Sequence, residues 1–147
     1  MDTILDSANT YFLEDIKYQS FKLRIDLVEG FVGSEPVAIQ LTKGFSLGGN
    51  YEIKPTDKSR HFSVLFEHPV AWQVVDESFC CYDESEKIDT TGFLRVMQNT
   101  EYYRYVKKKH GWFEDVIGPA KHYRLHSENE TIDVISCYEP EIIKIKG

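Results

Sequence analysis

Apolar and polar residues alternate along much of this chain. Over residues 21–27 every second residue is apolar, beginning with Phe21, and the residues between are charged. That period predicts a strand with one buried face, which Gly30 follows as a stop. Residues 62–66 repeat the alternation. Residues 70–75 have apolar side chains at both odd and even positions, which indicates a strand covered on both faces.

Several other segments have weaker patterns. Residues 2–15 are interpreted as a short helix or an irregular lead-in to the first strand. Residues 37–42 and 51–53 are predicted as strands, and the glycine-rich stretch over residues 43–51 as the connection between them. Residues 91–97 predict a further strand.

One segment, residues 99–111, has the signals of a helix. Asn99 or Thr100 can cap its first amides, Lys107–Lys109 suit its last turn, and Gly111 suits its end. A stripe at a spacing of four residues is predicted to face the sheet: Tyr102, Val106 and His110.

The clearest hairpin joins residues 121–127 to residues 130–138 through the turn at Glu128 and Asn129. A two-residue loop fixes the register, which pairs apolar with apolar and basic with acidic residues. The predicted pairs are Leu125 with Ile132, Tyr123 with Val134, and Arg124 with Asp133. Pro140 then interrupts the pattern, and residues 141–145 form a short edge strand or a docked tail.

Taken together, the pattern predicts an α+β fold that is mainly β. About eight short strands form a curled antiparallel sheet, either barrel-like or a sandwich, with one or two helices packed on it. A length of 147 residues is typical of a single domain, so we assign residues 1–147 to one domain.

Charge narrows the classes of partner. The chain has 17 basic and 24 acidic residues and a net charge of −7, the wrong sign for neutralising phosphates. We therefore expect no nucleic acid partner. The N-terminal residues are acidic where a signal peptide needs bases, and no apolar run approaches the roughly 20 residues of a membrane span. These patterns predict a cytoplasmic protein with no membrane partner.

The cysteines and histidines do not form a recognisable catalytic or metal motif. Three cysteines, two of them adjacent, do not indicate a disulfide framework, and Cys80 and Cys81 are interpreted as small core residues at a strand end. His122 and His126 are four residues apart, which on a strand separates them by roughly 13 Å, too far to share a zinc ion. The glycine-rich stretch matches no phosphate-binding pattern. We expect neither a metal nor a cofactor.

The first functional hypothesis is a non-enzymatic protein-interaction module. Residues 76–89 contain six acidic residues and one basic residue, Lys87. The acidic docking face predicted there consists of Asp83, Glu84, Glu86 and Asp89. Such a face would recognise a basic protein, and in charge and size alone the chain resembles small bacterial immunity proteins, which neutralise basic toxins.

The alternative hypothesis is a pocketed β domain that binds a small molecule or performs simple acid-base chemistry with Glu77 and His122. Trp72, Tyr102 and Tyr123 would line the pocket. Glu77 has the parity of a buried position, so it would need a partner, and the polar residues proposed to surround it are His122, Arg124 and Asp133. The simpler interpretation, which we favour, is that Arg124 and Asp133 form only an exposed cross-strand pair.

Overall fold

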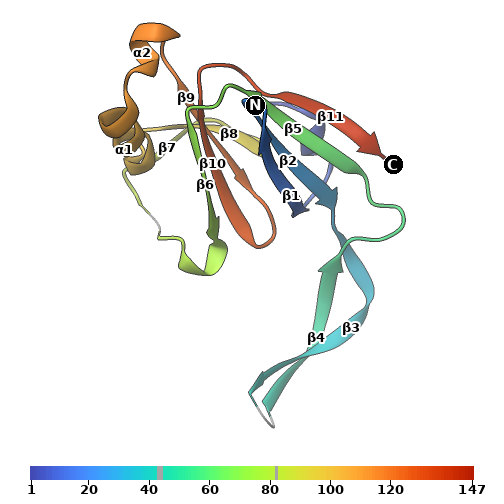
Figure 1. The fold of residues 1–147 in the computed structure, drawn as a ribbon. Helices are drawn as coiled ribbons and strands as arrows, with labels where there is room; N and C mark the ends of the chain where they lie inside the picture. Colours follow the sequence, from blue (N-terminus) through green and yellow to red (C-terminus); the bar gives the residue numbers. More distant parts are fainter. Residues whose placement is uncertain (43–44, 82) are drawn as a thin grey trace.

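A computed structural model describes residues 1–42, 45–81 and 83–147 of the chain; for residues 35–42 and 45–50 it describes the backbone alone. The fold is mainly β, as predicted, with antiparallel sheets that do not close into a barrel (Figure 1). The four-stranded sheet has the order β1 (Tyr11–Gln19), β2 (Lys22–Glu29), β5 (His61–Glu67), β11 (Glu141–Lys146). The five-stranded sheet has the order β6 (Ala71–Asp76), β10 (Glu130–Ser136), β9 (Lys121–His126), β8 (Leu94–Gln98), β7 (Lys87–Thr90).

The remaining elements flank these two sheets. A two-stranded ribbon, β3 (Phe31–Thr42) and β4 (Phe45–Lys54), extends away from the rest of the molecule (Figure 1). The helix α1 (Glu101–His110) and the short α2 (Phe113–Val116) lie beside the five-stranded sheet. Two 3₁₀ turns complete the chain, η1 (Ile4–Ser7) and η2 (Glu77–Phe79).

The two large sheets share one apolar core, which the alternating strands predict. The inward residues of the four-stranded sheet include Leu23, Ile25, Leu27, Phe62, Val64 and Phe66. Those of the five-stranded sheet include Leu94, Val96, Tyr123, Leu125, Ile132 and Val134. Burying each such side chain contributes roughly 1.5–3 kcal/mol. The core therefore fills the space between the sheets and fixes which face of each strand points outward.

The predicted helix and hairpin are both confirmed. Thr100 caps α1 by accepting a hydrogen bond from the Tyr103 amide, and the lysines lie in its last turn. The hairpin of β9 and β10 has the predicted register, with Arg124 opposite Asp133. The C-terminal residues form the edge strand β11. His110, however, is exposed, so the buried stripe of α1 ends at Val106.

Other local predictions are wrong. The described residues contain eleven strands, more than the eight or so predicted. The predicted short helix is confined to the 3₁₀ turn η1, and residues 11–15 form the start of β1, because β1 pairs with β2 in a tight hairpin. Its turn residues, Ser20 and Phe21, have positive φ angles of 53° and 62° without a glycine or asparagine to signal the turn. Phe21 is consequently exposed.

Two further corrections concern the strands on either side of β5. Residues 45–54 are the strand β4, although residues 43–51 were predicted as a connection; residues 43 and 44 lie outside the described part of the chain. Residues 70–75 were predicted to be covered on both faces, but β6 is an edge strand with Val74 exposed. Among the described residues, no helix has the length and apolar character needed to cross a lipid bilayer.

Candidate functional site

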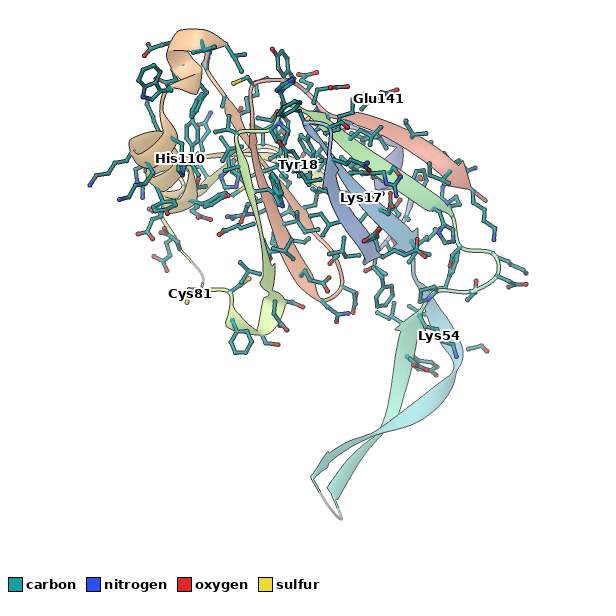
Figure 2. All side chains as sticks on the ribbon, viewed as in Figure 1. Lys17, Tyr18, Lys54, Cys81, His110 and Glu141 are labelled. Atoms are coloured by element: carbon teal, nitrogen blue, oxygen red, sulfur yellow. The ribbon has the colours of Figure 1, made fainter. Side chains whose placement is uncertain are left out.

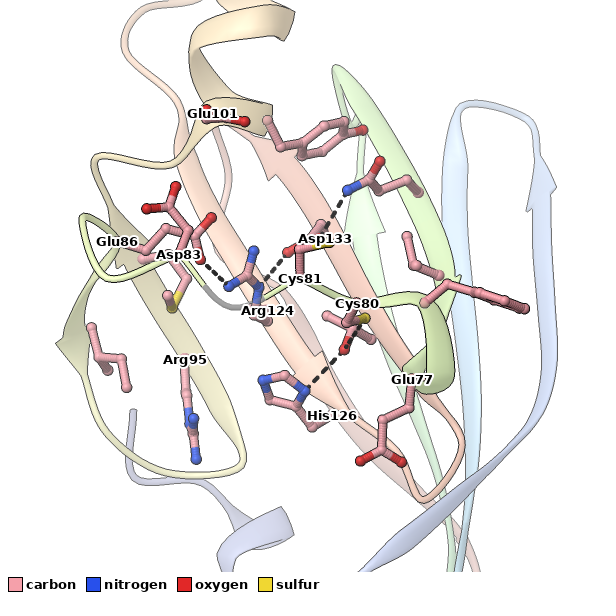
Figure 3. Close-up of a pocket in the computed structure, with 17 residues that line it drawn as sticks. Glu77, Cys80, Cys81, Asp83, Glu86, Arg95, Glu101, Arg124, His126 and Asp133 are labelled. Atoms are coloured by element: carbon pink, nitrogen blue, oxygen red, sulfur yellow. Dashed lines mark hydrogen bonds and ion pairs between the residues drawn. The ribbon is translucent and has the colours of Figure 1, made fainter.

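The outer face of the five-stranded sheet contains an open pocket of about 760 Å³ (Figure 3). It forms there because β6 and β7 lie at opposite edges of the sheet, so residues between them in sequence must cross its outer face. Cys80, Cys81 and Asp83 from this segment line the pocket. The Asp76 carboxylate and the Asn129 carbonyl hold η2 at the start of the crossing by accepting amide hydrogen bonds at 2.8 Å.

The centre of the pocket floor is the carboxylate of Asp133. Asp133 pairs across the sheet with Arg124 on one side and Gln73 on the other. Its Oδ1 accepts hydrogen bonds from Arg124 Nε at 2.7 Å and His122 Nε2 at 2.6 Å, and its Oδ2 accepts one from Gln73 Nε2 at 3.1 Å. Asp133 is only 2% exposed. A buried carboxylate needs such partners to remain charged.

These contacts lower the pKa of Asp133. Burial raises the pKa of this carboxyl group, but the hydrogen bonds from His122 and Arg124 and their positive potential outweigh burial and hold the pKa at about 2. Asp133 is therefore ionised at neutral pH and organises the floor of the pocket.

His122 lies beneath α1 and connects the helix to this carboxylate. Its Nδ1 is 2.6 Å from Thr100 Oγ1, its Nε2 contacts Asp133, and its ring meets the edge of Tyr102 at 5.8 Å between centroids. Thr100 thus caps the helix and contacts the histidine with one hydroxyl. His122 is 1% exposed and both of its ring nitrogens have partners, so it positions Asp133 and does not contact the pocket.

Arg124 makes a second ion pair that sequence reasoning missed. Its Nη1 contacts Glu86 Oε2 at 2.6 Å, in addition to the Nε contact with Asp133 (Figure 3). Burial lowers the pKa of this guanidinium, but the two carboxylates raise it overall. Arg124 therefore holds the crossing segment against the sheet, and the two carboxylates neutralise its charge.

Three other carboxylates surround the pocket: Glu77, Asp83 and Glu101. Within the part of the chain that the structure describes, none of them forms an ion pair. Asp83 accepts hydrogen bonds from the hydroxyl and amide of Ser85, which lower its pKa. The apolar part of the lining includes Val75, Phe79, Ile88, Met97 and Tyr102.

Some of the residues predicted to line a pocket lie together in this one, and others lie elsewhere. Glu77, Tyr102, Arg124 and Asp133 all line the pocket. Trp72 lies on the opposite face of β6, against Tyr18, and Tyr123 is in the core between the sheets.

We favoured an exposed surface contact between Arg124 and Asp133, and this prediction is wrong, because Asp133 is buried and Arg124 is half-buried in the pocket floor. Glu77 belongs to the exposed turn η2 at the pocket rim, so the predicted burial of Glu77 beside His122 is wrong. The partners in the cluster are instead Thr100, Gln73 and Glu86.

The predicted docking acids divide into two pairs. Asp83 and Glu86 line the pocket, and Glu86 is held by Arg124, whereas Glu84 and Asp89 are exposed outside the lining. The prediction that Cys80 and Cys81 are core residues is wrong, because both thiols are exposed. No three histidine, cysteine, aspartate or glutamate side chains among the described residues lie close enough to hold a metal ion.

Comparisons with protein-family models, with curated proteins and with solved structures gave no match for this chain. The site is therefore interpreted from its own geometry.

Proposed function

We propose that this chain is a protein-binding module that receives a basic segment of a partner in the pocket on the outer face of its five-stranded sheet. The observation that carries the proposal is the set of three carboxylates, Glu77, Asp83 and Glu101, that surround an apolar lining without an ion-pair partner in the described residues. Lysine or arginine side chains of a partner would complement this potential and speed its association.

The shape of the pocket favours a macromolecular partner over an enclosed small molecule. The space between the two sheets is filled by side chains, and the pocket lies open on the surface. Phe79 is 78% exposed at its edge, a large apolar side chain with no role in the core. Exposed aromatic rings beside carboxylates suit the mixed apolar and cationic character of a basic protein segment.

The alternative of acid-base chemistry by Glu77 and His122 has less support. His122 is buried, and both of its nitrogens already have partners, so neither can exchange a proton with a bound molecule without breaking the cluster. Glu77 lies at the rim on another element. The two groups therefore do not form a catalytic pair around a shared substrate position.

A selection from a displayed library of random peptides tests the proposal. The bait is the whole chain in three forms: unchanged, the pocket variant Glu77→Gln/Glu101→Gln, and the control Glu84→Gln/Asp89→Asn. Both variants remove two negative charges, but only the first removes them from the pocket. Glu86 stays unchanged in all three, because its loss would remove one of the two ion pairs of Arg124.

We expect the unchanged chain and the control to enrich peptides that combine lysine or arginine with apolar residues. The pocket variant should lose this enrichment, and the affinity of a selected peptide should fall about tenfold and depend less steeply on salt. Enrichment of neutral or acidic peptides, or equal binding by the pocket variant, would contradict the proposal.

A further inference from the structure

Two arginines lie directly opposite each other in the five-stranded sheet. Arg95 of β8 pairs with Arg124 of β9, and both side chains line the pocket. Like charges at opposite positions of neighbouring strands destabilise the pairing unless something neutralises them. This pair therefore requires a source of negative charge on the outer face.

Only one of the two arginines forms a direct ion pair within the described residues. Arg124 has Asp133 and Glu86. Arg95 forms no ion pair within the described residues; its Nε donates to the Gly92 carbonyl at 3.1 Å, and no hydrogen bond of its terminal nitrogens to a described residue is observed. Arg95 is half-buried and lines the pocket, so its two terminal nitrogens can donate hydrogen bonds side by side to a ligand there.

The neighbours of Arg95 extend this donor group. His126 lies at the same end of the pocket, and its Nδ1 is 3.1 Å from Thr131 Oγ1, to which the Cys80 thiol also donates at 3.4 Å (Figure 3). Partial desolvation lowers the pKa of His126, and the positive charges of Arg95 and Arg124 lower it further, while Asp133 and Glu77 act in the opposite sense. Arg95, which has no ion-pair partner among the described residues, therefore contributes positive potential at this end of the pocket.

We infer that Arg95, together with His126, forms a subsite for a carboxylate group at this end of the pocket. The subsite goes beyond the proposed function and does not depend on it, because a free carboxylate would bind there without a protein partner. One negative charge neutralises Arg95 in bidentate geometry. A phosphate dianion would carry excess charge toward the nearby carboxylate of Glu77, so the subsite should prefer a carboxylate to phosphate.

The experiment follows the ring protons of all five histidines by NMR while the whole chain is titrated with sodium acetate or with sodium phosphate. Sodium chloride keeps the ionic strength constant. We expect acetate to shift the His126 signals in a saturable way and to raise the pKa of His126 by about one unit, since a carboxylate beside it offsets Arg95. His68, exposed on another part of the molecule, serves as the internal control.

Variants separate the subsite from general ion effects. Arg95→Gln should abolish the saturable shift, Arg95→Lys should weaken it severalfold, and Lys58→Gln, which removes one positive charge from a distant turn, should leave it unchanged. Arg95→Lys also covers the case in which the glutamine variant does not fold. An unsaturable shift in the unchanged chain, a shift that persists in Arg95→Gln, or phosphate binding as tightly as acetate would overturn the inference.

A second arm identifies where the carboxylate comes from. N-acetyl-trialanine with a free C-terminus is compared with the same peptide carrying a C-terminal amide. Tighter binding of the free acid than of acetate assigns the group to a peptide, and equal binding assigns it to small acids; both results support the subsite. Binding of the amide as tightly as the acid would overturn it. None of these measurements uses a basic peptide, so failure here and failure of the proposed function remain distinct.

Discussion

The two faces of the five-stranded sheet are built by the same strands in different ways. Along β9, Tyr123 and Leu125 point into an apolar core that a second sheet closes, while Arg124 points outward into a network of charges. Figure 2 shows the side chains on the ribbon, and the labelled charged residues Lys17, Lys54 and Glu141 are exposed. The inner face is stabilised mainly by the burial of apolar side chains.

The outer face has buried charge and must compensate for its desolvation. The desolvation of Asp133 is compensated because three hydrogen-bond donors on the two neighbouring strands contact its carboxylate. An apolar contact tolerates small movements, but a buried ion pair loses its benefit when one partner is displaced. The outer face should therefore respond to mutation through charge and pH, whereas the inner face should respond through volume.

The largest expected effect comes from removing the central carboxylate. Asp133→Ala leaves Arg124 and His122 without their shared acceptor and should lower the free energy of unfolding by about 3–5 kcal/mol, measured by urea denaturation. The triple variant Asp133→Ala/Arg124→Leu/Glu86→Gln also removes Arg124 and the carboxylate that still pairs with it, and should recover part of that loss. A triple variant less stable than the single one would show that the outer face depends on volume after all.

A smaller effect is expected from acid. The pKa of Asp133 is about 2 in the folded protein, below the ordinary value of 3.8 for an aspartate in the unfolded chain. Its ionisation therefore stabilises the fold above pH 4, and this contribution disappears as the pH falls toward 2. The amount is about 2 kcal/mol. The difference in unfolding free energy between the unchanged chain and Asp133→Asn should shrink over this range. A constant difference would mean that the carboxylate is not specifically stabilised.

The smallest effect concerns the support of the outer face by α1. Thr100→Val removes the helix cap and the hydroxyl that contacts His122 Nδ1, and should lower the free energy of unfolding by about 1–2 kcal/mol. Thr100→Ser keeps the hydroxyl and should stay close to the unchanged chain. If serine is as destabilising as valine, the hydroxyl alone does not account for the contribution of Thr100.

The sequence pattern correctly predicted those elements that depend on interactions between residues close together in the chain. The register of β9 and β10 follows from a two-residue turn and matched pairs, and α1 follows from its capping residues and its lysines. The same reasoning failed for β1, whose turn at Ser20 and Phe21 has positive φ angles without the usual residues. It also placed Phe21 in the core.

The candidate site was predictable only in part. The sequence suggested that His122, Arg124 and Asp133 share one side of a hairpin, because a strand has a period of two. It contained no signal that Glu86 would reach Arg124 or that Arg95 would lie opposite it, since both contacts depend on which distant strands become neighbours.

What the sequence determined by itself is the alternation that assigns each side chain to one face of a strand, together with the excess of acidic residues. Only the tertiary structure decided that β6 and β7 occupy opposite edges of one sheet, so that the segment between them covers the outer face. The physical reason is that side-chain alternation is a property of a single strand, whereas strand order results from packing two whole sheets around a common core.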